Sequence, residues 1–178
     1  MEWVECERLN DGLVAYYSFD DCTAKDLSGN GNDGTINGAK CVDGNFGKAL
    51  EFNGVDDYVK IDKRFDLSQI TVIAWIKPRS FRDWAGIVTY GTKSHSPWAL
   101  QVWGDGALRF IINWNGSFKA INSIIKMQAN PANYYFVAAT YDGSVVRLYI
   151  NGILDSQATW DTPIESGQTG AYLSLIHI

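Results

Sequence analysis

The stretch from Asp26 to Thr35, with the sequence DLSGNGNDGT, constrains the fold more than any other part of the chain. Its three glycines lie within six residues and are interleaved with asparagine and aspartate. Glycine adopts positive φ freely, and Asn and Asp tolerate it better than most residues, so the backbone can turn tightly more than once. The sequence therefore predicts a tightly coiled loop here, which we call the Gly/Asn loop.

The side chains of the Gly/Asn loop are mostly hard oxygen donors, namely Asp26, Ser28, Asn30, Asn32 and Asp33. Ca²⁺ takes roughly six to eight oxygen ligands in proteins, so a loop of this kind suits it. The loop is not an EF-hand, because counting from Asp26 the twelfth position is Asn37, where a bidentate glutamate is needed. A metal loop and a solvated turn between two strands are both compatible with this composition.

The balance of acidic residues favours a β protein. Fifteen of the twenty acids are aspartate, which favours turns and metal loops, whereas glutamate favours helices. A chain of 178 residues fits one domain, and 46% hydrophobic residues can supply a full core. Seven tryptophans are present, and some of them are candidates for a binding face.

Charge and hydropathy exclude several classes of protein. The net charge is −5 and no basic cluster exceeds two residues, whereas nucleic-acid binding needs a basic footprint. No run of about 18 apolar residues occurs, so we expect no membrane insertion. Residues 1–12 carry no periodic pattern, and we interpret them as a linker or the remnant of a preceding module.

Alternating runs bounded by turn residues predict strands and hairpins. Residues 13–19 are β-branched and aromatic and predict a strand, and Gly104-Asp105-Gly106 predicts a hairpin between two alternating runs. Turns at 142–143 and 151–152 predict a three-stranded meander over residues 134–158. In the run before Gly104, Gln101 and Trp103 share one face, a polar and aromatic pairing that suits a sugar-binding sheet.

Several motifs resemble the laminin G-like, concanavalin A-like jelly-roll family. The matching pieces are 28–35, 47–50, 53–59, 71–77, 136–143 and 148–152, in that order, within about residues 12–160. The resemblance implies an all-β fold, a two-sheet antiparallel β-sandwich of the jelly-roll type, over residues 13–172. The final hexapeptide, residues 173–178, is interpreted as a non-native tail of a truncated gene.

The same resemblance implies one structural Ca²⁺ ion. Family members usually keep an acid after the first strand, here Asp20, and another just before the aromatic residue Tyr58, here Asp57. Asn30 and Asp33 would add oxygens from the Gly/Asn loop, and Asp142 is a weaker candidate because a tight turn also explains it.

The three cysteines suggest one disulfide. Cys22 and Cys41 flank the Gly/Asn loop, and many relatives carry a pair here, so we expect these two to be linked. The alternative is two buried free thiols, and Cys6 is left over in either case. A disulfide would imply an oxidising, extracellular or cell-surface location.

Three functions compete at this stage. The first is a non-catalytic module of a larger secreted or surface protein that binds a glycan or an extracellular protein. The second is a structural spacer, and the third a glycoside hydrolase, which would need two carboxylates about 5 to 10 Å apart. The sequence lacks acids two residues apart on one strand, so we expect no enzyme. The candidate ligand-binding residues are Trp84, Trp98, Trp103, Trp114, Arg82, Asp83 and Gln101.

Overall fold

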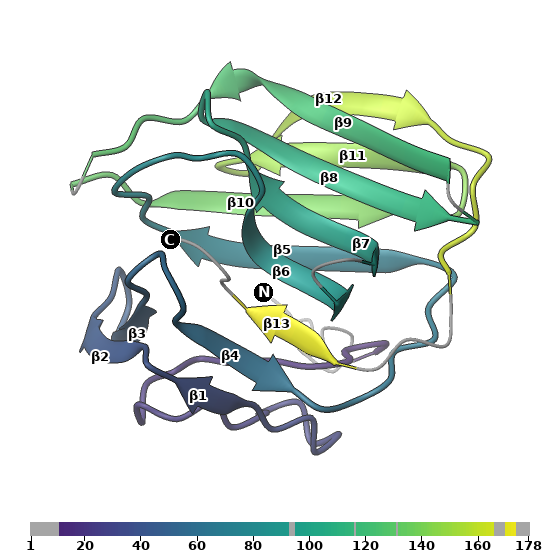
Figure 1. The fold of residues 1–178 in the computed structure, drawn as a ribbon. Coiled ribbons are helices and arrows are strands. Elements are labelled where there is room, and N and C mark those ends of the chain that lie inside the picture. Colours follow the sequence, from purple (N-terminus) through teal and green to yellow (C-terminus); the bar gives the residue numbers. More distant parts are fainter. Residues whose placement is uncertain (1–10, 93–94, 116, 131, 166–169, 174–178) are drawn as a thin grey trace, which may run out of the picture.

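The computed structural model describes residues 11–92, 95–115, 117–130, 132–165 and 170–173 (Figure 1). These residues form thirteen strands, and every strand pair is antiparallel. The described part of the chain contains no helix, and therefore no helix that could cross a membrane. The predicted all-β class is confirmed.

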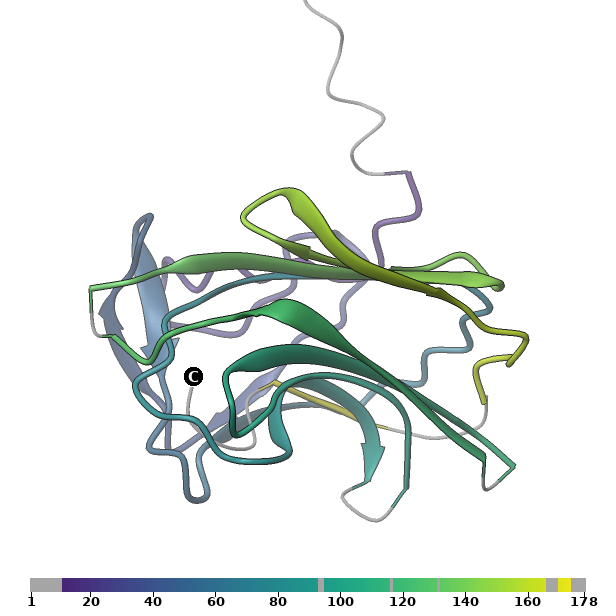
Figure 2. The ribbon, with the colours of Figure 1, turned by 90° about the horizontal axis from the view of Figure 1, so that it is seen from above.

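Two sheets form the layers of the sandwich (Figures 1 and 2). The seven-stranded sheet has the order β1 (Thr35–Asn37), β4 (Tyr58–Ile61), β13 (Ala171–Leu173), β6 (Ala85–Thr92), β7 (His95–Val102), β8 (Ala107–Trp114) and β9 (Ser117–Lys126). The four-stranded sheet has the order β12 (Ile153–Thr159), β11 (Val145–Ile150), β10 (Tyr135–Tyr141) and β5 (Ile70–Ile76). A separate hairpin consists of β2 (Lys40–Asp43) and β3 (Lys48–Glu51).

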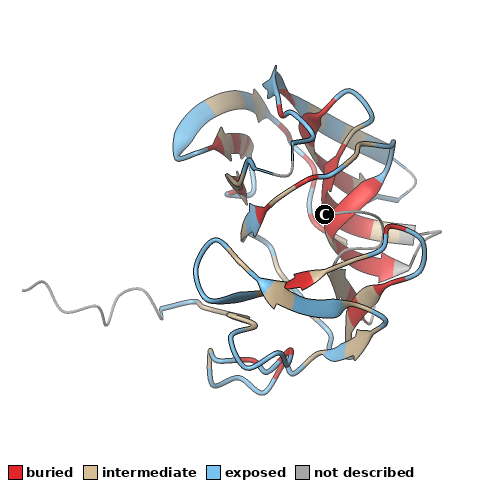
Figure 3. Cartoon of the chain, turned by 90° about the vertical axis from the view of Figure 1, so that its left-hand side faces the viewer, coloured by how far each residue is buried: buried red, intermediate tan, exposed pale blue. Residues whose placement is uncertain are grey.

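The main core lies between the two sheets, where the buried residues in Figure 3 gather. Leu100 and Phe110 from the larger sheet and Val137 and Leu148 from the smaller one are completely buried. Side chains alternate between the faces of a strand, so each sheet keeps a second face directed away from this core. That second face of the larger sheet carries the candidate site.

The predicted hairpin and meander are confirmed. Strands β7 and β8 pair through Gln101 opposite Arg109, on either side of the Gly104–Gly106 turn. Gly106 has φ +84°, and a Cβ there would lie 2.3 Å from the backbone oxygen of Met127, so the turn requires glycine. Strands β10, β11 and β12 pair in chain order over the predicted meander.

The strand predicted over residues 13–19 is wrong. The backbone of this segment bonds to the Gly/Asn loop instead of to a sheet: the Tyr16 amide donates to Asp26 Oδ1 at 3.0 Å, and the Asn32 side chain donates to the Val14 carbonyl at 2.8 Å. Short polar side chains compete with β ladders for backbone groups, which explains why β propensity alone misplaced this segment.

Cys22 and Cys41 form a disulfide, as predicted, with their Cα atoms 5.4 Å apart. The bond ties the segment before the Gly/Asn loop to strand β2. Leu173, which we assigned to the tail, is the last residue of β13 and pairs with both β4 and β6. The rest of the proposed tail, and Cys6, lie outside the described residues.

Candidate functional site

A cluster of aromatic rings surrounds one arginine on the outer face of the larger sheet. Strand β8 directs Leu108 and Phe110 into the core, so Arg109 between them projects from the opposite face. We call this surface the Arg109 face, and its residues are Trp84, Gln101, Trp103, Arg109, Phe118 and Asn122.

The guanidinium group of Arg109 lies against three rings. Its Cζ atom is 4.1 Å from the centre of the Trp103 ring, 5.2 Å from that of Trp84 and 5.4 Å from that of Phe118. Trp84 and Trp103 also meet edge to face, with centroids 4.8 Å apart. These are cation–π distances, and they hold the arginine without a carboxylate. Trp84 remains 51% and Phe118 45% exposed, so ring surface is left for a ligand.

Trp84 has an unusual backbone. Its φ is +66°, a left-handed conformation that a bulky side chain rarely adopts. Such a conformation costs of order 1–3 kcal/mol and persists where the surroundings over-determine it, often at ligand-binding positions. The strain sets the direction in which the Trp84 ring leaves the chain just before β6.

Two polar atoms of the Arg109 face have no hydrogen-bond partner among the described residues. Gln101 is only 6% exposed, and within the described residues its Oε1 accepts no hydrogen bond. Arg109, directly opposite Gln101 in the register, has an equally unpartnered Nε. Burial lowers the pKa of Arg109, and the nearby Asp83 partly offsets this. Unsatisfied buried groups cost about 1–3 kcal/mol each, so this site is under-satisfied without a ligand.

The structure gathers some of the predicted ligand-binding residues and separates others. Trp84, Trp103 and Gln101 come together, and Asp83 lies beside them, where its Oδ1 accepts the Gly104 amide at 2.9 Å. Arg82 is exposed in the loop before β6 and makes no hydrogen bond within the described part of the chain.

Two of the predicted tryptophans do not belong to the Arg109 face. Trp98 is 4% exposed and stacks on Tyr90 in the core, so its ring is inaccessible and its prediction as a stacking platform is corrected. Trp114 is 40% exposed, but strand alternation directs it away from the face that carries Arg109 and Asn113.

Sequence reasoning missed Arg109, Phe118 and Asn122. A signal for the arginine was present, because a hairpin turning at Gly104–Gly106 places Arg109 opposite Gln101. The contribution of β9 had no such signal: Asn122 pairs with Arg109 only after a register shift in β8–β9.

The Gly/Asn loop is organised around a buried carboxylate. Asp26 is 5% exposed, and its oxygens accept backbone amides from Tyr16 at 3.0 Å and from Ser28 and Asn32 at 2.9 Å each. Burial raises the pKa of Asp26, but the hydrogen bonds outweigh it, so the pKa lies below its ordinary value. Burial and the charges of Asp26 and Asp33 raise the pKa of Tyr17 above its usual range.

Three of the predicted calcium ligands each accept one backbone amide. Asp20 accepts the Lys48 amide at 3.0 Å, Asp33 the Asp26 amide at 2.8 Å and Asp57 the Asn53 amide at 2.8 Å. In each case only one carboxylate oxygen is used by the described residues.

The remaining two candidate ligands have other tasks. Asn30 uses its side-chain nitrogen to donate to the Leu13 carbonyl at 2.7 Å. Asp142 accepts amides within its own turn, and these bonds together with Arg147 lower its pKa. Over the described residues, no three acidic, histidine or cysteine side chains are grouped closely enough to hold a metal.

Comparison with solved structures shows the same fold. Domain 4 of AbnA, an extracellular GH43 arabinanase from Geobacillus stearothermophilus in complex with arabinotriose, has a TM-score of 0.76 at 23% identity, covering 90% of this chain and 82% of that one. The receptor-binding domain of a botulinum neurotoxin C/D mosaic serotype has a TM-score of 0.68 at 16% identity, covering 95% of this chain and 45% of that one.

The CBM40 of the Ruminococcus gnavus IT-sialidase, bound to α2,6-sialyllactose, has a TM-score of 0.54 at 15% identity, covering 78% and 79%. No curated protein matches the sequence. The sequence profile of the concanavalin A-like lectin/glucanases superfamily matches residues 53–175. The chain therefore belongs to the concanavalin A-like lectin/glucanase superfamily.

Proposed function

We propose that the protein is a non-catalytic carbohydrate-binding module and that it binds glycan on the Arg109 face. The observation that carries this proposal is the set of rings around Arg109 together with the buried Gln101, whose Oε1 has no hydrogen-bond partner among the described residues. The apolar faces of sugar rings stack on aromatic side chains, and planar amide and guanidinium groups bond to pairs of hydroxyls. Both kinds of group are present within one surface.

The comparisons support a glycan ligand. The arabinanase domain was solved with arabinotriose and the sialidase module with sialyllactose, and both share this fold. At 23% and 15% identity the likeness extends to the fold alone. The ligand proposed for this chain is therefore inferred from its own residues.

The residues around the site argue against hydrolysis. Strands β6 to β9 contain neither aspartate nor glutamate, and the nearest acid is Asp83, which positions the Gly104 amide. A glycosidase needs a pair of carboxylates flanking the scissile bond. Glu51, the one glutamate in a described strand, lies on β3 and forms an ion pair with Arg79. Binding without cleavage is therefore the proposed activity.

We place the module outside the cell, as part of a larger secreted or surface protein. A disulfide between Cys22 and Cys41 persists in oxidising compartments and is rare in the cytosol. A structural Ca²⁺ ion at Asp20, Asn30, Asp33 and Asp57 belongs to the same proposal, supported by the oxygen-rich loop and the unused carboxylate oxygens. A structural spacer without ligand remains the competing function.

A glycan array with the purified protein tests the proposal. We expect binding to at least one glycan, and loss of that binding in the double variant Trp84→Ala/Trp103→Ala. Trp114→Ala is the matched control, because it removes an exposed indole that lies off the Arg109 face. If the double variant binds the same glycans equally well, or if the wild type binds none, the Arg109 face is not a glycan site.

A further inference from the structure

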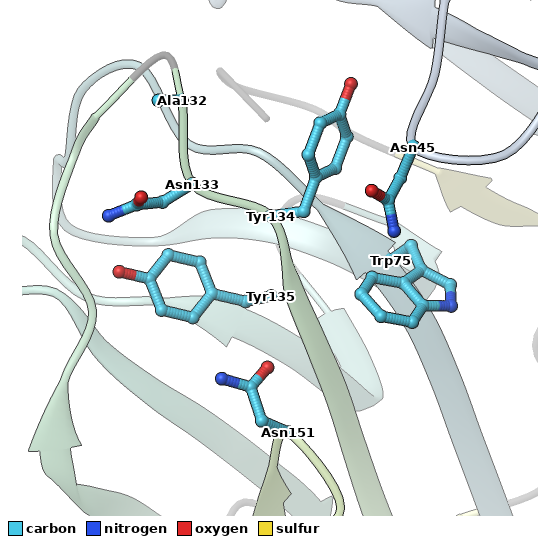
Figure 4. A pocket seen from close by; sticks show the side chains of 7 residues that line it. All are labelled: Asn45, Trp75, Ala132, Asn133, Tyr134, Tyr135 and Asn151. Carbon is cyan, nitrogen blue, oxygen red and sulfur yellow. The ribbon is translucent and has the colours of Figure 1, made fainter.

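A hollow lies at the four-stranded sheet, at the ends of β5 and β10 (Figure 4). Its volume is about 490 Å³, and we call it the Trp75 hollow. The residues that line it are Asn45, Trp75, Ala132, Asn133, Tyr134, Tyr135 and Asn151. They come from the β2–β3 turn, the end of β5, the segment before β10 with the first residue of β10, and the β11–β12 turn. None belongs to the Arg109 face.

Trp75, which lines the hollow, is the middle ring of an exposed aromatic row. Trp75 is 49% exposed, and its ring lies between those of Phe46 and Phe136, each with its centroid 5.4 Å away. Phe46 itself is 72% exposed. Large rings grouped on a surface in this way retain water-exposed apolar area that a ligand can cover.

The polar side chains that line the hollow are neutral, and the nearby Lys77 directs its Nζ to the Tyr134 ring, 4.6 Å from the ring centre. Three asparagine amides and two tyrosines line the hollow, and none of its lining residues carries a charge. Asn151 Oδ1 accepts the Phe136 amide at 3.0 Å, which fixes the side chain and leaves its NH₂ group for a ligand. In Figure 4 the Asn45 amide lies beside the Trp75 ring. Amides next to an aromatic ring match a sugar, which presents hydroxyls at its edge and C–H groups on its face.

One wall of the hollow, at Asn45, belongs to the disulfide-linked segment. Asn45 and Phe46 lie in the β2–β3 turn, and Cys41 on β2 is bonded to Cys22. Asp20 accepts the Lys48 amide at the end of the turn, and a Cβ on Gly47 would lie 1.9 Å from the Asp20 carboxylate. The segment around Cys22 therefore supports the turn in its position beside Trp75.

We propose that the Trp75 hollow is a second binding site, independent of the Arg109 face, for neutral oligosaccharides. One sugar ring stacks on Trp75, and the amides of Asn45 and Asn151 bond to its hydroxyls. The Cys22–Cys41 disulfide organises this site and not the other one, because every residue of the Arg109 face lies between Trp84 and Asn122, outside the disulfide-linked segment.

NMR titration of the ¹⁵N-labelled protein tests this site. The probes are cellohexaose, xylohexaose, maltohexaose and arabinohexaose, each raised to about 10 mM, above the ~1 mM Kd of a weak single-site complex. We expect at least one probe to shift the Trp75 indole signal and the Asn45 and Asn151 side-chain signals. Trp84→Ala/Trp103→Ala should leave these shifts intact, which separates this site from the proposed function.

Variants decide whether the hollow itself binds. Trp75→Ala should weaken the affinity about tenfold or more, because the indole supplies most of the stacking area. Asn45→Ala is a second, milder variant, and Ile73→Ala is the matched control, since Ile73 is 56% exposed on the same strand but does not line the hollow. Cys22→Ser/Cys41→Ser should weaken binding in the folded protein. No shift with any probe, or equal affinity in Trp75→Ala and Ile73→Ala, would overturn the proposal.

Discussion

The Cζ atom of Arg109 lies 4.1 Å from the centre of the Trp103 ring, although the two residues belong to opposite arms of the β7–β8 hairpin. The contact holds the guanidinium plane near the ring, and Trp84 and Phe118 limit its movement on other sides. No described carboxylate forms an ion pair with Arg109, and its Nε has no hydrogen-bond partner among the described residues, so this donor is left for a ligand. The contribution of Arg109 to ligand binding can therefore be measured.

Replacing Arg109 should impair binding more than stability. Arg109→Met removes the donors but retains an apolar chain against the rings, so we expect loss of glycan binding with a melting temperature close to that of the wild type. Arg109→Lys keeps the charge but not the planar fork, and it should restore little of the affinity. Isothermal titration with the best array glycan and a thermal melt measure the two effects. Full affinity in Arg109→Met would remove the arginine from the site.

Much of the fold could be predicted from local patterns. Turn residues at 104–106 and 151–152 set hairpins, and alternation assigned Gln101 and Trp103 to one face correctly. The same alternation assigned Trp98 to the opposite face, and the structure shows that this is the core face. The prediction of Trp98 as a ligand-binding residue did not take this alternation into account.

Non-local geometry could not be predicted. Residues 13–19 have strand propensity, but their partners are side chains of the Gly/Asn loop, which no periodicity reveals. Asn45 and Trp75 meet only because the β2–β3 hairpin folds over the smaller sheet. A register shift in β8–β9 likewise determines which β9 side chain faces Arg109.

Asp26→Asn should destabilise the protein. The substitution replaces one acceptor oxygen by an NH₂ group that faces a backbone amide, where two donors cannot bond to each other. We expect a loss of about 1–3 kcal/mol in the free energy of unfolding, measured by urea denaturation. Asp21→Asn is a suitable control, because Asp21 is exposed and bonds only within its own turn. Equal losses in the two variants would contradict the central role of Asp26.

Stability should fall in acid partly through the same residue. The pKa of Asp26 is lower in the folded protein than the ordinary value, so its contribution is fully present above the unfolded pKa of about 4 and is lost as pH falls through the folded pKa. Unfolding free energies measured between about pH 7 and 2 should therefore decline below about pH 4. Asp26→Asn should show a smaller decline than the wild type. Parallel curves would show that Asp26 does not contribute to the acid sensitivity.

Removing the disulfide should cost stability. The two cysteines have a sequence separation of 19. A crosslink of this length reduces the entropy of the unfolded chain and so stabilises the folded protein by about 3 kcal/mol. Cys22→Ser/Cys41→Ser should unfold at correspondingly lower denaturant, and the wild type treated with reductant should match it. A reductant effect that persists in the double variant would have another origin.

Calcium should raise the melting temperature if the oxygen-rich loop holds an ion. A metal that binds only the folded state stabilises it by about 2.7 kcal/mol at a hundredfold excess over Kd. Added CaCl₂ should therefore raise the melting temperature of the wild type, and EGTA should lower it. The oxygens of Asp20, Asp33 and Asp57 that no described residue uses are the ones available to the ion.

Asp57→Ala and Asp56→Ala form the matched pair for this test. Asp57 is buried and accepts the Asn53 amide, whereas Asp56 is exposed and accepts only the Asn53 side chain. Asp57→Ala lowers the starting stability by losing that hydrogen bond, so the informative quantity is the response to calcium and not the melting temperature itself. We expect that response to vanish in Asp57→Ala and to persist in Asp56→Ala. A wild-type melting curve that ignores both CaCl₂ and EGTA, with no metal found by elemental analysis, would mean that backbone amides and carboxylates alone hold the loop.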